Sequence, residues 1–252
     1  SAIGSDVALG STQARGVRLG ASLTAALAYS GVLLQVGLSV SADANGYGPL
    51  GETLHILSFF TMVSNLVVAV VSTMLAIDPS RSGRWFDGLR LAALVMISVT
   101  GIVYWLLLAG EPTTGLDWVA NMLVHSVVPV AAVGSWLLVG PHGRFRWGLL
   151  PLMLLIPVAW LVFAMLRGAV AGFYPYFFMD VAEVGYASAG LNILGIVVFV
   201  VVAGTRVLDA ARRFLGFRLK LSFQLRTSSE FGADRVKVIG QTGHLIHSVS
   251  GG

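Results

Sequence analysis

The chain has 252 residues, of which 56% are apolar and only 11% are charged. A soluble domain of this length does not tolerate such a composition on its surface, so the sequence excludes soluble enzymes and predicts an integral membrane protein. The absence of cysteine excludes disulfides, thiolate nucleophiles and thiolate metal ligands. The net charge of +4 is explained by the unequal distribution of basic residues between loops, so no nucleic-acid partner is expected.

A helix needs about 20 apolar residues to cross a hydrocarbon core. Because the residues before Gly20 lack the features of a cleaved signal, we expect the first apolar segment to be a retained span. The predicted fold is an all-α membrane protein, a bundle of six transmembrane helices in domain 20–207, between a cytoplasmic segment 1–19 and a basic cytoplasmic tail 208–252. The predicted spans are Gly20–Val40, Leu54–Ile77, Leu89–Leu108, Trp118–Val139, Leu149–Arg167 and Val184–Val207.

Basic residues fall in alternate connections, and this pattern predicts orientation. The segment before the first span, the second-to-third connection and the fourth-to-fifth connection contain Arg15, Arg18, Arg81, Arg84, Arg90, Arg144 and Arg146. The opposite connections contain Arg167 as their only basic residue, together with Glu52, Glu111, Asp117, Asp180 and Glu183. Both termini are therefore expected to be cytoplasmic.

The tail after the sixth span has a different pattern. Apolar and polar residues alternate over 218–226, and a short apolar stretch follows at 236–239. Strict alternation is typical of a strand, so the two stretches predict a small β-hairpin. A basic surface on anionic lipid headgroups and a disordered tail are the alternatives.

The stretch Ser58–Asn65 contains a hydroxyl and an amide, Thr61 and Asn65, on one face of the second predicted span. Neither gains from facing lipid, so both are expected to point at a protein partner or a wet cavity. With a rise of about 1.5 Å per residue, Thr61 and His125 both lie about 10 Å below the outer boundary. Gln35 and Asn192 fall in the same half of the membrane, which predicts a polar pocket open to the outer side.

Asn121, His125 and Pro129 form a column at a spacing of four residues in the fourth span. Proline has no N–H to donate to the carbonyl of His125, so the helix is expected to be loosened where the imidazole lies. An ionisable residue at this depth is a functional candidate by default. The alternatives are an ordinary proline kink and a histidine that bonds a neighbouring helix for packing alone.

Thr61 and His125 together predict nucleophilic catalysis. A threonine hydroxyl becomes a useful nucleophile when a base takes its proton, and a neutral histidine is such a base near pH 7. The amides of Asn65 and Asn121 are candidate donors to a developing oxyanion, although each is also explained by an interhelical hydrogen bond. Neither span contains a carboxylate, so an amide, a backbone carbonyl or water must orient the imidazole.

Three further residues are candidates for substrate binding. Arg167 is a candidate anchor for a lipid carboxylate, or else an ion-pair partner of Asp180 or Glu183. Tyr174 and Tyr176 are candidates for a pocket lid, or else interfacial anchors. No His-Glu-x-x-His spacing occurs, and the single His-x-x-His pair, His244 and His247, lies in the tail away from the other candidate ligands, so neither a metal nor another cofactor is expected.

Several short motifs carry a family resemblance over about residues 15 to 210. The motifs are Ser58–Asn65, Asn121–Pro129, Gly140–Arg144, and Arg167-Gly168 followed by Tyr174-Pro175-Tyr176 and Asp180. In their order and spacing they resemble the bacterial branch of the androgen-induced-protein-like (FAR-17a-like) membrane family. The resemblance implies a multi-pass hydrolase of fatty acid esters of hydroxy fatty acids in a bacterial inner (plasma) membrane, with Thr61 and His125 as its catalytic pair.

A second function remains open at this point. The same polar residues would suit a transporter or lipid-binding protein in which they bind cargo or relay a proton. Transporters commonly contain repeated halves or broken helices in matching positions, and neither is visible in the sequence. The sequence thus favours a lipid ester hydrolase, with membrane lipids and a lipid ester as its partners.

Overall fold

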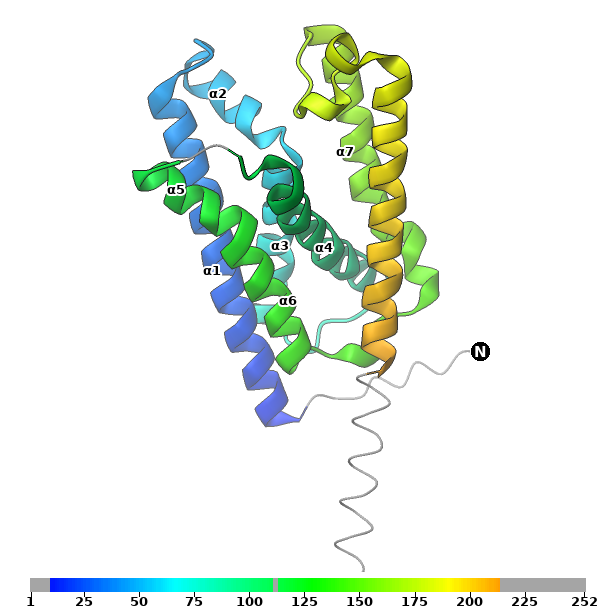
Figure 1. The fold of residues 1–252 in the computed structure, drawn as a ribbon. Helices are drawn as coiled ribbons and strands as arrows, with labels where there is room; N and C mark the ends of the chain where they lie inside the picture. The colour runs from blue at the N-terminus through cyan, green and yellow to red at the C-terminus, as the bar shows by residue number, and fades with distance from the viewer. Residues whose placement is uncertain (1–9, 111–112, 214–252) are drawn as a thin grey trace, which may run out of the picture. The chain divides into compact units, whose positions relative to one another are not determined.

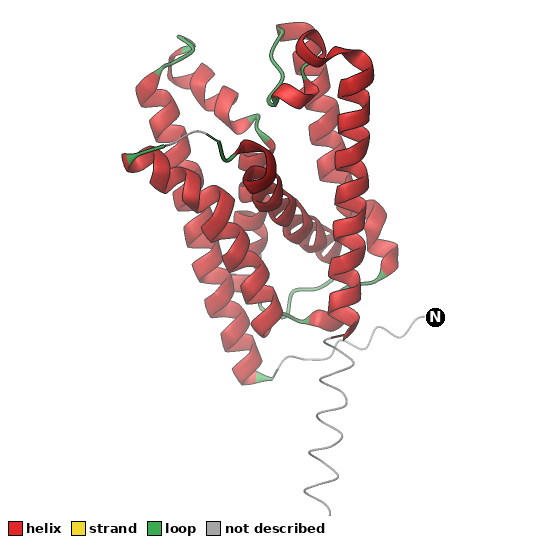
Figure 2. Cartoon of the chain, viewed as in Figure 1, coloured by secondary structure: helices red, strands yellow, loops and turns green. Residues whose placement is uncertain are grey.

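The computed structural model describes residues 10–110 and 113–213. The chain divides into two compact units, 1–209 and 210–252, and the main apolar core belongs to the first of them. The described residues form helices and no strands (Figure 2). Six of these helices are long and apolar enough to cross a membrane, which confirms the predicted multi-pass, all-helical class. The predicted hairpin at 218–226 and 236–239 lies outside the described residues.

Three of the six spans are composite. The spans are α1 (Ser11–Ala42); α3 (Phe60–Ile77); α4 (Arg84–Val103) with the π-helical turn η1 (Tyr104–Leu108); α5 (Gly115–Met122), the π-helical turn η2 (Leu123–Val127) and α6 (Val128–Val139); the 3-10 turn η4 (Trp147–Leu149) with α7 (Leu150–Ala171); and a C-terminal helix, Val181–Arg213. The short helices α2 (Gly48–Leu57), η3 (His142–Arg144) and η5 (Phe177–Met179) lie in the connections. Because consecutive spans run in opposite directions, the connections alternate between two ends of the unit (Figure 1).

One of these ends carries most of the arginines in the connections. Arg81, Arg144 and Arg146 lie there, and Arg84 begins α4 at the same end. We call it the arginine-rich end. The opposite end holds α2, the residues 109–110 and 113–114 that flank α5, and the 172–180 connection (Figure 1).

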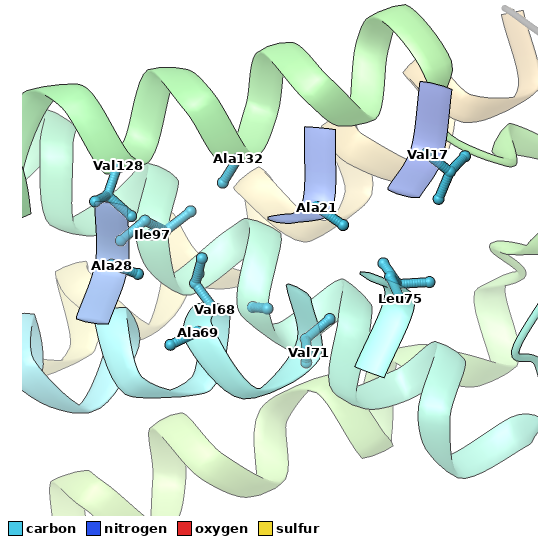
Figure 3. Packing of buried hydrophobic residues seen from close by; sticks show 11 residues of the cluster. Val17, Ala21, Ala28, Val68, Ala69, Val71, Leu75, Ile97, Val128 and Ala132 are labelled. Carbon is cyan, nitrogen blue, oxygen red and sulfur yellow. The ribbon is translucent and has the colours of Figure 1, made fainter. Parts of the chain in front are cut away.

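The main apolar core lies between α1, α3, α4 and α6 (Figure 3). Its members are mostly small or β-branched and come from all four helices: Val17, Ala21, Ala28, Val68, Ala69, Val71, Leu75, Ala93, Ile97, Val128 and Ala132. Small residues let helix backbones approach closely, and van der Waals packing drives helix association where lipid removes the hydrophobic term. A second cluster joins α7, η5 and the C-terminal helix around Ala164, Phe178 and Met179.

The prediction of one continuous second span from Leu54 to Ile77 was wrong. The chain breaks at Ser58 and Phe59, where Phe59 is extended, so α2 is a separate helix and Thr61 is the second residue of α3. The break has no glycine or proline. It is stabilised from α7, because the indole N–H of Trp160 donates to the carbonyl of Ser58 at 2.9 Å and Arg167 donates to the Ser58 hydroxyl.

Other spans are longer than predicted at their arginine-rich ends. The first begins at Ser11 rather than Gly20, and the third begins at Arg84 rather than Leu89. A span predicted from apolar residues stops at the first charged residue. The helix itself can continue past that residue, because a long charged side chain extends to the membrane interface. Arg90, which is the second residue of the predicted third span and was counted with the charges of the connection before it, is inside α4 and only 3% exposed.

The close approach of α1 to η2 depends on Gly31. A Cβ at this position would lie 2.9 Å from Cγ1 of Val124 and 3.3 Å from Cβ of Leu123. Gly31→Val is expected to overpack this contact, at a cost of about 1–3 kcal/mol, and to lower the melting temperature of the purified protein. Gly37→Val is the matched control on the same helix, since a Cβ at Gly37 meets nothing within 4 Å. Equal melting temperatures for the two variants would contradict this account of the helix contact.

Candidate functional site

Thr61 and His125 meet across two spans. The Oγ1 of Thr61, in the first turn of α3, lies 3.2 Å from Nε2 of His125 in η2. Thr61 is buried and His125 is partly buried, so the contact is largely shielded from the surroundings. The predicted pair is thus brought into hydrogen-bonding distance.

The second ring nitrogen determines the direction of this bond. Nδ1 of His125 lies 3.1 Å from the backbone carbonyl of Asn121, one turn earlier. A carbonyl only accepts, so Nδ1 carries the proton in the neutral ring and Nε2 presents a lone pair. The Thr61 hydroxyl then donates to Nε2, which is the arrangement required of a nucleophile and its base. Of the three orienting groups that the sequence allowed, the structure supplies the backbone carbonyl.

The π-helical turn η2 positions the imidazole. The predicted loosening before Pro129 takes this form, with the N–H of Val128 donating five residues back to Leu123. Such turns are rare and occur mostly at functional sites. Gly101 of α4 faces this segment, and a Cβ there would lie 3.2 Å from the carbonyl oxygen of His125.

Tyr104 completes the surroundings of His125 and was missed by the sequence reasoning. Its ring stacks on the imidazole with centroids 4.0 Å apart and an interplanar angle of 20°. The Asn121 side-chain amide donates to the Tyr104 hydroxyl. Tyr104 lies in η1, so both π-helical turns contribute to the site. In the sequence this tyrosine is only one of several aromatics near a span end, and no signal separates it from a lipid anchor.

Asn65 joins the same two spans through the backbone. Its amide nitrogen donates to the carbonyl of Thr61 at 2.8 Å and to that of Val124 at 3.1 Å. Both N–H bonds of this amide are therefore engaged, while its buried Oδ1 has no hydrogen-bond partner. In this arrangement Asn65 fixes η2 against α3. The Asn65 amide therefore has no N–H left to donate to a substrate bound at Thr61.

Thr61 also borders a partly open cavity between α3 and α4 on one wall and α7 and the C-terminal helix on the other. The prediction that this pocket is polar was wrong, because the cavity is lined almost entirely by apolar side chains. Its few polar groups belong to Thr61, Thr100, Trp160 and Tyr176, and neither Gln35 nor Asn192 lines it. Thr61 is therefore the point at which the histidine site meets an apolar cavity.

The two tyrosines of the 172–180 connection differ in position. Tyr176 lines the cavity beside Phe60 and Thr61. Burial raises the pKa of Tyr176, and the nearby Thr61 hydroxyl and the backbone of Phe60 and Thr61 oppose that rise only in part. The phenol therefore stays protonated near neutral pH. Tyr174 instead packs on Gly168 of α7, where a Cβ would clash with its ring, and does not line the cavity.

Arg167 forms no ion pair with Asp180 or Glu183 in the part of the chain that the structure describes. It donates to the hydroxyl of Ser58, its Nη2 lies 3.3 Å from Nδ1 of His55, and its guanidinium lies 4.4 Å from the ring centroid of Phe173. These contacts place a cation at the α2–α3 break, three residues before Thr61.

His55 and Glu52 lie beside this arginine on α2. Glu52 is 1% exposed and accepts hydrogen bonds from Ser39 and Asn45, which lower its pKa despite the opposing effect of burial. Burial, followed by the positive charge of Arg167, lowers the pKa of His55, while Glu52 acts in the opposite direction. Among the described residues, no three His, Asp or Glu side chains are grouped to hold a metal ion.

No family model, curated protein or solved structure matches this chain. The resemblance to the androgen-induced-protein-like family therefore stays a prediction from the sequence motifs. Function is inferred from the geometry of the site.

The depressed pKa of His55 predicts a pH dependence of stability. A histidine whose pKa is lower in the folded protein stabilises it fully above the unfolded value of about 6.5, and that contribution is lost as the pH falls. The melting temperature of the wild type should therefore drop between about pH 8 and about pH 5.5. The drop should be smaller in His55→Gln, since the other histidines titrate in both proteins. Identical profiles would contradict the assignment to His55.

Proposed function

We propose that this protein is an intramembrane hydrolase of lipid esters, with Thr61 as nucleophile and His125 as general base. The observation that carries the proposal is the chain of contacts from the Thr61 hydroxyl to Nε2 of His125 and from Nδ1 to the Asn121 carbonyl. This chain gives the imidazole one tautomer and one orientation, which a triad obtains from a carboxylate.

The reaction proceeds through an acyl-threonine. Oγ1 of Thr61 attacks the ester carbonyl carbon while its proton moves to Nε2 of His125. The tetrahedral intermediate collapses, the C–O bond to the leaving alcohol breaks, and His125 returns the proton to that alcohol. Water then attacks the acyl-threonine with His125 as base, which releases the fatty acid and restores the Thr61 hydroxyl.

Donors for the oxyanion lie at the start of α3. The backbone N–H groups of Phe60 and Thr61 are in the first turn, where a helix offers no carbonyl one turn earlier. The protonated Tyr176 hydroxyl lies beside the same backbone and has a proton of its own to donate. We assign oxyanion stabilisation to these groups, because the amides of Asn65 and Asn121 already donate to protein oxygens.

The cavity and Arg167 suggest the class of substrate. An apolar cavity that opens at one side suits an acyl chain, and Thr61 on its wall places the scissile carbonyl there. Arg167 and Ser58 lie at the adjoining break and suit a free carboxylate. A fatty acid ester of a hydroxy fatty acid has both parts, an ester within a hydrocarbon chain and a carboxylate at one end.

The same apolar cavity also favours a second function, lipid binding or transport without chemistry. In that case Thr61 and His125 would bind the ester and not react with it. Covalent labelling separates the two functions, because a binding protein retains lipid yet forms no adduct.

We further propose that both termini are cytoplasmic in a bacterial inner membrane. The arginines at one end of the described unit support this orientation. The Thr61–His125 site then lies toward the extracytoplasmic side.

A fluorophosphonate probe tests the nucleophile. The purified protein should react with a serine/threonine-directed fluorophosphonate, and Thr61→Ala or His125→Ala should abolish the reaction, because each removes one partner of the activated hydroxyl. Thr100→Val is the control, since Thr100 is a second threonine on the same cavity and lacks a histidine partner. Labelling that persists in the Thr61 and His125 variants would exclude this nucleophile.

Arg167 is tested by comparing acids with their methyl esters. Arg167→Ala should raise KM for substrates with a free carboxylate by about tenfold or more, the value of a charge-assisted hydrogen bond, and should change KM for the methyl esters little. Melting temperatures measured in parallel separate lost binding from lost packing at the α2–α3 break. Equal effects on acids and methyl esters would assign Arg167 to structure alone.

A further inference from the structure

The arginine-rich end contains a buried cation that the Thr61–His125 site does not use. Arg90 of α4 is only 3% exposed, and its guanidinium donates no hydrogen bond within the described residues. Its Nη1 is a buried donor without an acceptor. The guanidinium lies 5.6 Å from the ring centroid of Phe145, a cation–π contact that offsets only a small part of the cost of burying a charge.

Arg90 lines a second, partly open cavity between α1, α3, α4 and α6. Two more side-chain donors line it without a hydrogen bond, in addition to Ser135, whose hydroxyl donates to the carbonyl of Ala132. Trp136 is 5% exposed and its indole Nε1 is buried without a hydrogen-bond partner, while Ser72 is 8% exposed and makes no hydrogen bond within the described residues. No acidic residue of the described chain lines this cavity. A guanidinium, an indole N–H and a hydroxyl therefore lie on one cavity without a protein acceptor.

Among the described residues one carboxylate, that of Asp87, attracts Arg90, and the positive charge of Arg144 opposes it. Asp87 lies one turn earlier on α4 but forms no ion pair with Arg90, and it accepts a long hydrogen bond, 3.4 Å, from the N–H of Gly83. Arg144 adds a second positive charge near Arg90. Arg146 is a third positive charge, and it acts electrostatically on Asp87. One carboxylate thus faces three guanidinium groups.

We infer that this cavity binds the oxyanion of a phosphate group, held by Arg90, Trp136 and Ser72. A buried guanidinium is costly unless an anion with matching hydrogen-bond acceptors completes it. Phosphate oxygens fit the fork of the guanidinium and accept from the indole and the hydroxyl at the same time. The phosphate belongs either to an anionic lipid headgroup of the adjoining leaflet or to a small soluble ion. This site is independent of the proposed hydrolase.

The experiment measures stabilisation of the full chain in detergent. Melting temperature is recorded against inorganic phosphate, with sodium chloride at matched ionic strength, and against short-chain phosphatidylglycerol, with the corresponding diacylglycerol as the uncharged control. A ligand that binds only the folded protein raises its melting temperature with concentration. If the melting temperature rises to a plateau with inorganic phosphate, a soluble ion is sufficient to fill the site. If it does so only with phosphatidylglycerol, the ligand is a lipid headgroup.

Arg90→Gln should weaken binding by about tenfold or more, since it removes the charge and keeps a polar side chain. Arg146→Gln is the matched control, because Arg146 is an exposed arginine at the same end. Trp136→Phe removes the N–H and keeps the ring that stacks on Phe145, so it should weaken binding in a protein that folds even if Arg90→Gln does not. Absence of saturable binding in the wild type, or unchanged binding in Trp136→Phe or Arg90→Gln, would overturn the inference.

Discussion

A polar group inside a membrane span must be satisfied by the protein, and at the Thr61–His125 site this constraint produces an ordered chain of hydrogen bonds. The Thr61 hydroxyl bonds the imidazole, and the imidazole bonds a carbonyl of its own helix. No carboxylate is needed to orient the ring, because a backbone acceptor one turn away does so. The fixed tautomer and the proposed chemistry both follow from these hydrogen bonds.

The sequence predicted the main elements of the site. The prediction that Thr61 and His125 meet is confirmed by their 3.2 Å contact, although the depth of Thr61 was counted along a second span continuous from Leu54, which the structure breaks at Ser58. The proline four residues after His125 correctly indicated a loosened helix. Depth does not specify which residues of the remaining spans turn toward the pair, so Tyr104 and the commitment of the Asn65 amide to two carbonyls could not be predicted.

The remaining differences arise from tertiary contacts between distant segments. The break at Ser58 is stabilised by Trp160 and Arg167, about a hundred residues away, and nothing in 54–60 indicates it. The cavity is apolar because α7 and the C-terminal helix supply its other wall. Arg90 was counted with the charges of the second-to-third connection, yet it is a buried residue of α4. A hydropathy pattern cannot distinguish a buried guanidinium at a helix end from one that reaches the interface.

The central claim is that the Thr61 oxygen becomes acylated during turnover. The most direct measurement is tandem mass spectrometry of the protein quenched with acid during reaction with a slowly hydrolysed lipid ester. The account predicts an acyl mass on Thr61, and accumulation of that adduct when the second, hydrolytic step is slowed. An acyl group on another residue, or ester turnover by Thr61→Val at the wild-type rate, would contradict it.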